Sequence, residues 1–236
     1  MLRHIDYFNK AAPTYDDQAS VQQKIGNQLI SYLPALTADS RIIDLGCGTG
    51  LVTVQLAQHA TYAEFTALDL AERLLLIAKQ RLAPFGCKLQ QADFNHFNTP
   101  TPYDLVFSNM ALHWSNNFNH TLHIIKNLLA KHGSVAFSVP LQNTFIELKP
   151  YFAIHRFMRH DDILQNLLAC DYRIRLAQQE IIEEKFTDTL SALRSLKYTG
   201  VNFCAQRPNK SLKRTTFPTT ISKLTYHIGY YIIQHA

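Results

Sequence analysis

The stretch Arg41-Ile-Ile-Asp-Leu-Gly-Cys-Gly-Thr-Gly50 gives the strongest indication of fold in this chain of 236 residues. Its apolar residues predict a short buried strand, which Asp44 interrupts near its end. Three glycines follow at alternate positions, and glycine suits a backbone that must turn sharply or approach a ligand closely. Residues 51–59 then predict a helix. A strand, a glycine loop and a helix in this order are typical of the nucleotide-binding start of a doubly wound α/β domain.

The glycines are spaced Gly-x-Gly-x-Gly, because Leu51 stands where the dinucleotide fingerprint would have its third glycine. Together with the preceding acid, the stretch resembles motif I of the class I S-adenosylmethionine-dependent methyltransferases. The resemblance implies a Rossmann-like methyltransferase fold and an S-adenosylmethionine site at the loop, held by Asp44, Gly46, Cys47, Gly48 and Gly50. A glycine-rich loop can also be a tight turn that binds no ligand. The residues downstream distinguish between these two interpretations.

Two further acids stand at the ends of the next predicted strands. Asp69 lies in the apolar run 65–70, where a carboxylate can accept hydrogen bonds from both ribose hydroxyls of a nucleoside. The third run, 88–92, ends in Asp93 and Phe94. In the methyltransferases that the chain resembles, an acid at this place lies near the adenine amino group and the next residue lines the ring. The candidate cofactor residues at strand ends are therefore Asp69, Leu70, Asp93, Phe94 and Asn109.

The periodicity of the chain predicts an α/β fold with a mostly parallel, seven-stranded sheet and helices on both faces. Strands are predicted over 42–45, 65–70, 88–92, 104–108, 134–139, within 173–186 and over 224–233; helices over 21–33, 51–59, 71–82, 119–130 and 188–198, the last with Gly200 as its C-cap. We expect one domain over 1–236, with an N-terminal helical lid over about 1–34. Residues 141–170 should form a small helical cap above the carboxyl ends of the strands, where ligands bind in such sheets.

Composition narrows the class of protein. Hydrophobic residues make up 47% of the chain, which supports a folded core rather than disorder. We find no apolar run long enough to span a membrane and no apolar segment of a secretory signal at the N-terminus. The four cysteines are widely spaced, and neither they nor the histidines show a metal-ligand spacing. We therefore expect a cytoplasmic protein without a metal.

Charge is distributed unevenly. Asp188 is the last acid, and the segment 189–236 carries a charge of +7 while the remainder carries −2. The seven basic residues are Arg194, Lys197, Arg207, Lys210, Lys213, Arg214 and Lys223. Such a run is either a solvated face or a docking surface for an acidic partner.

Segments outside the glycine loop resemble the biotin-synthesis malonyl-acyl-carrier-protein O-methyltransferases. They are Phe8-Asn-Lys-Ala-Ala-Pro-Thr-Tyr15-Asp16, Ala19-Ser-Val-Gln22, Asp104-Leu-Val-Phe-Ser-Asn109, Leu112-His-Trp114, Asn143-Thr-Phe-Ile-Glu-Leu148, Arg156-Phe157, Leu193-Arg-Ser-Leu-Lys197 and Leu224-Thr-Tyr226. The chain departs from this family at Lys197-Tyr-Thr-Gly200, where Lys-Gly-Ile-Gly is usual, and at Arg159-His-Asp161, where Pro-Pro-Asp is usual. The resemblance implies methyl esterification of the free carboxylate of malonyl on an acidic acyl-carrier protein, or on coenzyme A.

That chemistry needs no general base, because a carboxyl group with a pKa near ~4 is already ionised at neutral pH. The protein has to position the carboxylate and exclude water. An arginine binds a carboxylate with two parallel hydrogen bonds, and we expect Arg156 in this role. Tyr15 would close the pocket and donate a hydrogen bond, and Lys197 is the next candidate for the carboxylate.

Three alternatives stay open. A methyltransferase of a small free carboxylic acid would use the same cofactor site. A nucleic-acid methyltransferase would also use the basic segment, although the fourth strand ends in Ser108-Asn109-Met110-Ala111 and not in the Asn-Pro-Pro-aromatic motif of base amino-methylating enzymes. A protein that binds S-adenosylmethionine without turnover is the third alternative.

Overall fold

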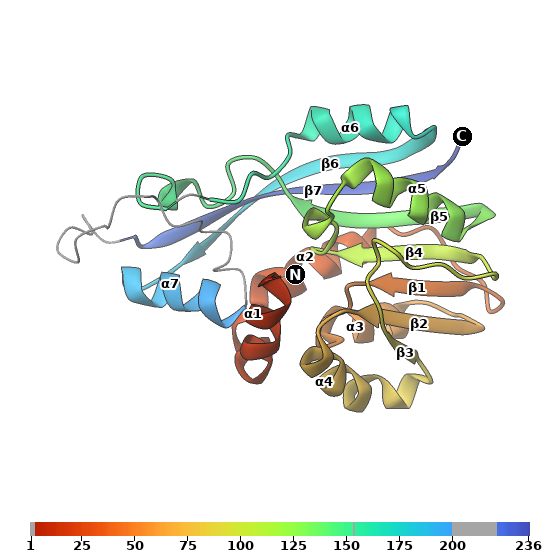
Figure 1. Cartoon of the computed structure of the whole chain (residues 1–236), viewed down its shortest axis with the longest axis horizontal. Helices are drawn as coiled ribbons and strands as arrows, with labels where there is room; N and C mark the ends of the chain where they lie inside the picture. Colours follow the sequence, from red (N-terminus) through yellow and green to blue (C-terminus); the bar gives the residue numbers. More distant parts are fainter. Residues whose placement is uncertain (1–2, 153, 200–220) are drawn as a thin grey trace.

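The computed structural model describes residues 3–152, 154–199 and 221–236 and is built around one seven-stranded sheet (Figure 1). The strands are β1 (Arg41–Leu45), β2 (Glu64–Asp69), β3 (Lys88–Gln91), β4 (Tyr103–Asn109), β5 (Leu129–Pro140), β6 (Tyr172–Lys185) and β7 (Lys223–His235). Their order in the sheet is β3-β2-β1-β4-β5-β7-β6. The first five strands pair in parallel, and β7 runs antiparallel to both β5 and β6. The predicted mostly parallel sheet of seven strands is confirmed.

Helices cover both faces of the sheet (Figure 1). The α-helices are α1 (Arg3–Ala11), α2 (Ser20–Ser31), α3 (Leu51–His59), α4 (Glu72–Leu82), α5 (Phe118–Leu128), α6 (His160–Ala169) and α7 (Thr189–Tyr198). Short 3-10 turns are η1 (Ala12–Thr14), η2 (Asp16–Gln18), η3 (Ala83–Phe85), η4 (Leu112–Trp114) and η5 (Ile146–Leu148).

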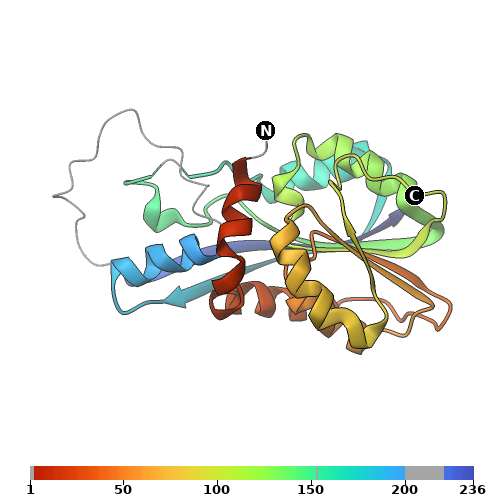
Figure 2. The same ribbon diagram turned by 60° about the horizontal axis from the view of Figure 1, so that its bottom comes forward.

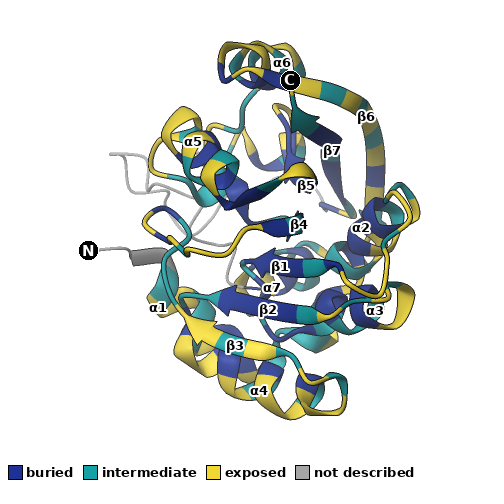
Figure 3. Ribbon diagram, turned by 90° about the vertical axis from the view of Figure 1, so that its right-hand side faces the viewer, coloured by how far each residue is buried: buried dark blue, intermediate teal, exposed yellow. Residues whose placement is uncertain are grey.

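Successive residues of β1 belong to different cores, because side chains alternate across a strand. Ile42 packs with Ile25 and Leu56 of α2 and α3, whereas Ile43 packs with Leu122 of α5 and Ile163 of α6. Both faces of the central strands are therefore buried, and Figure 3 shows them in dark blue beneath helices whose outer sides are exposed. This double burial explains why β1 is a continuous apolar run interrupted only by Asp44.

Strand β5 begins earlier than the sequence predicts. Helix α5 ends at Leu128, two residues before the predicted end, and β5 starts at Leu129 instead of 134. The pairing explains the difference: Tyr103 of β4 stands opposite Leu129, but Leu105 stands opposite Ser134, so extra residues of β5 form an irregularity between the two pairs. A bulge of this kind cannot be read from alternation alone.

Residues 141–170, the predicted cap, pack against two different parts of the sheet and its helices. Helix α6 packs beside α5 and β6 on a face of the sheet, with Ile163 and Leu167 buried. The preceding segment, which includes η5, lies next to β7. Within the residues that the structure describes, no helix has the length and apolarity needed to cross a membrane.

Helices α1 and α7 come from the N-terminal and C-terminal parts of the chain. Helix α1 stands between α4 and α7 in the view of Figure 2, and its main contacts are with α4. Asp188 is the N-cap of α7, and its carboxylate accepts from the Ser191 N–H in a capping box, as expected for a helix start there. The predicted C-cap Gly200 and the basic residues Arg207, Lys210, Lys213 and Arg214 lie outside the described residues.

Candidate active site

The glycine loop after β1 folds back on the neighbouring strand. The N–H groups of Gly46 and Cys47 both donate to the carbonyl of Leu68, at 2.7 and 3.0 Å. Gly46, Gly48 and Gly50 all have positive φ, the left-handed region that favours glycine. A Cβ on Gly46 would come within 2.4 Å of the Ala111 Cβ, whereas a Cβ on Gly48 would meet nothing within 4 Å. Gly46 therefore serves close packing, and Gly48 presents bare backbone to open space.

Asp69 holds this loop from the end of β2. Its two carboxylate oxygens accept from the N–H groups of Gly48 and Ala71, both at 2.8 Å. Burial raises the pKa of Asp69, and these backbone hydrogen bonds act in the opposite direction. Each oxygen keeps a second lone pair, so the carboxylate can still accept from a bound hydroxyl.

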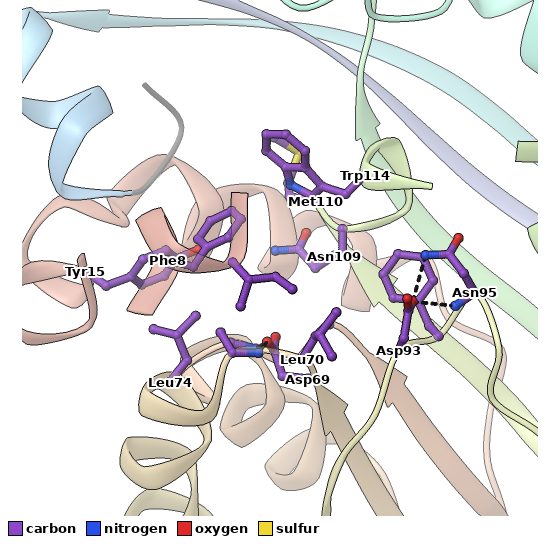
Figure 4. A pocket seen from close by; sticks show the side chains of 16 residues that line it. Phe8, Tyr15, Asp69, Leu70, Leu74, Asp93, Asn95, Asn109, Met110 and Trp114 are labelled. Atoms are coloured by element: carbon purple, nitrogen blue, oxygen red, sulfur yellow. Dashed lines mark hydrogen bonds between the residues drawn. The ribbon is translucent and has the colours of Figure 1, made fainter. Parts of the chain in front are cut away.

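Asp69 and Gly48 line a hollow with an empty volume of about 690 Å³, which we call the donor hollow (Figure 4). The predicted residues that line it are Tyr15, Gly46, Gly48, Asp69, Leu70, Asp93, Phe94 and Asn109. Figure 4 shows Asp69 and Leu70 on one side, with Phe8 and Trp114 across from them. The structure thus brings together residues from the ends of β1, β2 and β4 and from the loop after β3.

Asp93 and Asn109 are fixed by their own hydrogen bonds. The Asp93 carboxylate accepts from the N–H and the side-chain amide of Asn95, at 2.8 and 2.7 Å. The Asn109 amide donates to the Gln22 carbonyl at 3.0 Å and accepts from the Ser138 hydroxyl at 2.7 Å. Asn109 therefore connects α2, β4 and β5 at the wall of the donor hollow.

The remaining predicted cofactor residues lie beneath or beyond the loop. Asp44 and Cys47 line a second hollow of about 410 Å³ at the glycine loop, here called the loop hollow. Gly50, at the start of α3, instead packs against Leu82 at the end of α4. Asp44 is 2% exposed and accepts from the Thr53 hydroxyl at 2.7 Å. Burial raises the pKa of Asp44 to about 7, although the Thr53 hydrogen bond opposes the shift. Burial also raises the pKa of the Cys47 thiol, so this thiol is not activated as a nucleophile.

Tyr15 occupies the junction of the site. It lines the donor hollow, the loop hollow and a third hollow of about 470 Å³, which we call the acceptor hollow. The donor and acceptor hollows also share Phe8, Met110 and Trp114. Burial raises the pKa of the Tyr15 hydroxyl far above neutrality, so it remains a hydrogen-bond donor. The role of Tyr15 in closing the pocket over an acceptor stays a prediction.

Gln22 of α2 is a functional candidate that sequence reasoning quoted within a motif but did not nominate. It lines both the acceptor hollow and the loop hollow, and its buried Oε1 atom has no hydrogen-bond partner among the residues that the structure describes. A buried acceptor oxygen without a partner costs about 1–3 kcal/mol, which a ligand that donates a hydrogen bond could recover. Met110 has φ of +54°, a strained value for a non-glycine residue, and it too lines all three hollows.

Three other hydroxyl groups that line the acceptor hollow already donate hydrogen bonds within the protein. Thr144 donates to the His227 carbonyl at 3.0 Å, and Thr199 donates to the Ser195 carbonyl at 2.9 Å. Tyr226 donates to Glu184 at 3.0 Å. Among the described residues that line this hollow there is no lysine or arginine.

Arg156 and Lys197 are not brought into the donor or acceptor hollow. Arg156 is exposed and lines a neighbouring hollow of about 700 Å³, separated by a wall that includes His113, Pro140 and Phe157. Lys197 is exposed because α7 turns Leu196 and Thr199 toward the acceptor hollow, which leaves the adjacent residue outward. Neither Arg156 nor Lys197 lines the acceptor hollow, and the expectation that one of them binds the acceptor carboxylate stays a prediction.

The comparisons with known proteins agree with this arrangement. A family model for a methyltransferase domain matches residues 42–133. Malonyl-[acyl-carrier protein] O-methyltransferase 2 from Coxiella burnetii is 35% identical over 231 residues, which cover 95% of this chain and 92% of that protein. The chain belongs to the malonyl-[acyl-carrier protein] O-methyltransferase family.

Some other members of this family match a smaller part of the chain. The enzyme from Bacillus cereus is 36% identical over 148 residues, 61% of this chain and 55% of that protein. The crystal structure of the N-methyltransferase NodS from Bradyrhizobium japonicum, in complex with S-adenosyl-L-homocysteine, superimposes with a TM-score of 0.57 at 13% identity. That match covers 92% of this chain and 87% of NodS, and at this identity it supports the class I methyltransferase fold alone. No group of metal-binding side chains occurs among the described residues.

Proposed function

We propose that this protein transfers the methyl group of S-adenosylmethionine to the free carboxylate of a malonyl thioester on an acyl-carrier protein, in the biosynthesis of the pimeloyl part of biotin. The observation that carries the proposal is the likeness to the Coxiella relative over nearly the whole of both chains. The junction of two hollows at Tyr15 supports it, because methyl transfer needs a donor site and an acceptor site that meet.

The residues of the donor hollow fit S-adenosylmethionine. Gly48 offers backbone that a ligand can approach, and the Asp69 carboxylate has lone pairs for the ribose hydroxyls. Leu70 and Phe94 provide apolar surface for an adenine ring, near Asp93. Asp44, with Cys47 beneath the loop, would balance the charge of the α-ammonium group. When bound, the cofactor supplies a methyl group on a positively charged sulfur.

The acceptor carboxylate is ionised at neutral pH and needs no base, so the protein's contribution is orientation and exclusion of water. In this proposal the Tyr15 hydroxyl and the Nε2–H group of Gln22 donate hydrogen bonds to it, since the other hydroxyls considered above are bonded within the protein. The Oε1 of Gln22 accepts from a donor group of a ligand, not from the carboxylate. Phe8, Met110 and Trp114 shield the junction from water. Two neutral donors hold the carboxylate loosely enough for its oxygen to remain nucleophilic, whereas a buried arginine fork would stabilise its charge.

The lid over 1–34 and the cap over 141–170 remain part of this proposal. Of the cap, Thr144, Phe145 and Phe157 line the acceptor hollow. The outer face of α7, with Arg194 and Lys197 exposed, is the described part of the basic region that we propose an acidic carrier protein contacts. Arg156 and Lys197 would then act at the rim, on the carrier, and not on the carboxylate.

Turnover assays with malonyl carrier protein, malonyl-coenzyme A, a small dicarboxylic acid and RNA, run side by side, test the proposal. We expect the carrier-bound malonyl group to have the highest kcat/KM. A preference for the free acid or for RNA would replace the proposed acceptor, and binding of S-adenosylhomocysteine without turnover of any of the four would favour a non-catalytic protein. Faster reaction of malonyl-coenzyme A than of the carrier thioester would remove the carrier from the proposal.

Gln22→Ala tests the acceptor assignment. Loss of a hydrogen bond to a charged group costs about 1.5–3 kcal/mol, so kcat/KM for the acceptor should fall by roughly 10-fold to 100-fold. The affinity for S-adenosylhomocysteine should change by less than about threefold, and Gln22→Glu should be worse than Gln22→Ala because two carboxylates would face each other. Asn27→Ala, an exposed position on the same helix, is the matched control. A large loss of S-adenosylhomocysteine affinity with unchanged acceptor kinetics would instead assign Gln22 to the donor.

A further inference from the structure

The N-terminal segment that carries Tyr15 rests on the rest of the molecule through a small apolar patch. Ala12 packs with Ala71 and Leu74 at the start of α4, and Ile5, Phe8, Tyr15 and Ile77 surround this cluster. Within the described part of the chain, no hydrogen bond of the Tyr15 hydroxyl holds its ring in place, and the ring is held there by packing alone. We therefore looked for polar contacts that hold this segment over the donor hollow.

Asp16, the next residue, is bound to two separate parts of the cofactor-binding half. Its Oδ2 accepts from Nη2 of Arg81, in the last turn of α4, at 2.5 Å. Its Oδ1 accepts from the hydroxyl of Thr49, in the glycine loop, at 2.6 Å. Arg81 closes the triangle, because its Nη1 donates to the carbonyl of Thr49 at 2.8 Å.

This triangle is sheltered and borders only the loop hollow, through Thr49. Thr49 is 1% exposed, and the side chains of Asp16 and Arg81 are 32% and 27% exposed. Neither Asp16 nor Arg81 lines the donor or the acceptor hollow. Any effect of Asp16 on ligands must therefore pass through the elements that it joins.

We propose that Asp16 is a positioning residue: it latches the N-terminal lid to the glycine loop and to α4, and thereby sets Tyr15 over the donor hollow. Tyr15 and Asp16 are consecutive, so anchoring one carboxylate on two elements leaves the neighbouring side chain little freedom. Because Thr49 lies between Gly48 and Gly50, the same latch orders the loop that approaches the donor. The inference goes beyond the proposed function, since it concerns the donor side and holds for any acceptor.

The latch predicts that donor affinity depends on residues that the donor does not touch. Asp16→Asn keeps the size of the side chain and removes its charge. We expect the Kd for S-adenosylhomocysteine, measured by calorimetry, to rise about tenfold, as for the loss of a hydrogen bond between charged groups. Asp17→Asn makes the same chemical change on the exposed neighbouring residue and should leave the Kd within about twofold. Equal effects of the two variants would overturn the proposal.

Trp114 gives a spectroscopic report of the lid. It is the only tryptophan of the chain, it lines the donor hollow, and its ring meets that of Phe8 on α1 edge to face at 5.7 Å. In the ligand-free protein, Asp16→Asn should shift the Trp114 emission toward that of a solvent-exposed indole, and Asp17→Asn should not. An unchanged emission together with an unchanged Kd would show that the lid does not depend on Asp16.

A double-mutant cycle separates a latch from general damage. Arg81→Ala should raise the Kd about as much as Asp16→Asn, and the double variant should be no worse than either single variant, because both remove the same triangle. Fully additive losses would contradict the latch. If Arg81→Ala does not fold, Thr49→Val and Thr49→Ser replace it: the valine variant should weaken binding and the serine variant, which keeps the hydroxyl, should not.

Discussion

The donor and acceptor sides of the site are built in different ways. The donor hollow depends on backbone: two glycines of one loop, and carboxylates that follow parallel strands and bind backbone N–H groups. The acceptor hollow depends on side chains from parts of the chain far apart in sequence, from Gln22 of α2 to Tyr226 of β7. Adding a side chain to the backbone of the donor hollow should therefore weaken donor binding. Exchanging one polar side chain of the acceptor hollow for another should change the acceptor specificity.

The largest effect is expected from Gly46→Ala, compared with Gly86→Ala. Both glycines have positive φ, so both variants carry about 1–2 kcal/mol of backbone strain. Only the new Cβ at Gly46 would meet another atom, the Ala111 Cβ at 2.4 Å. Gly46→Ala should therefore lower the free energy of unfolding by a further 1–3 kcal/mol or so, measured by denaturant titration, and weaken S-adenosylhomocysteine binding about 100-fold.

Gly86→Ala is the control, since a Cβ there meets nothing within 4 Å and Gly86 lies after η3, away from the donor hollow. Its affinity for S-adenosylhomocysteine should stay near that of the unmodified protein. Similar losses in the two variants would mean that strain at positive φ, and not close approach to Ala111, governs the loop.

The same contrast explains what the sequence could predict. The donor residues follow directly from local pattern, because a strand, a glycine loop and an acid at the next strand end occupy fixed places in a doubly wound sheet. Asp69 and Gly48 were identified in this way, and they do line one hollow. Cys47 and Asp44 were placed at the same loop, and burial assigns them to the space beneath it.

The acceptor side could not be predicted in this way. Arg156 lies in an irregular segment with no periodicity, so nothing in the sequence indicates which hollow it borders. Lys197 was open to better reasoning: Leu193 and Leu196 already mark the inner side of α7, and the residue after Leu196 points about 100° away from it. Gln22 lies in the first turn of the helix whose apolar side includes Val21, Ile25 and Leu29, and only its oxygen, unpartnered among the described residues, distinguishes it.

A smaller effect is expected from pH, through Asp44. Its pKa of about 7 means that the carboxylate gains charge between mildly acidic and mildly alkaline pH. A ligand with an α-ammonium group favours the charged form, so S-adenosylhomocysteine affinity should fall as pH falls through this pKa. If only the charged form binds tightly, the loss between pH 8 and pH 6 is about tenfold, measured by calorimetry.

Asp44 should affect stability in the opposite direction. A carboxyl whose pKa is raised on folding is ionised more readily in the unfolded chain, so the free energy of unfolding of the ligand-free protein should decrease as pH rises from about 4 to about 7. Asp44→Asn should flatten both profiles. A binding profile that keeps its full pH dependence in Asp44→Asn would assign the titration to another group.

The smallest effects should come from the charges outside the acceptor hollow. Arg194 and Lys197 lie on the exposed side of α7, whose inner side lines the hollow with Leu196 and Thr199. Charges at the rim of an interface alter the association rate and its salt dependence more than the chemical step. Arg194→Glu and Lys197→Glu should each raise the KM for malonyl carrier protein about threefold to tenfold at low salt, with kcat nearly unchanged. Lys79→Glu, on the exposed face of α4, makes the same charge change away from the acceptor hollow and should leave this KM unaltered.

The KM for malonyl-coenzyme A should respond much less to the α7 variants, because this substrate presents no protein surface to α7. Added salt should reduce the difference between the variants and the unmodified protein. Equal changes for both thioesters, or a KM that ignores salt, would mean that α7 does not contact the carrier, and the acceptor side would then rest on the neutral groups within its hollow.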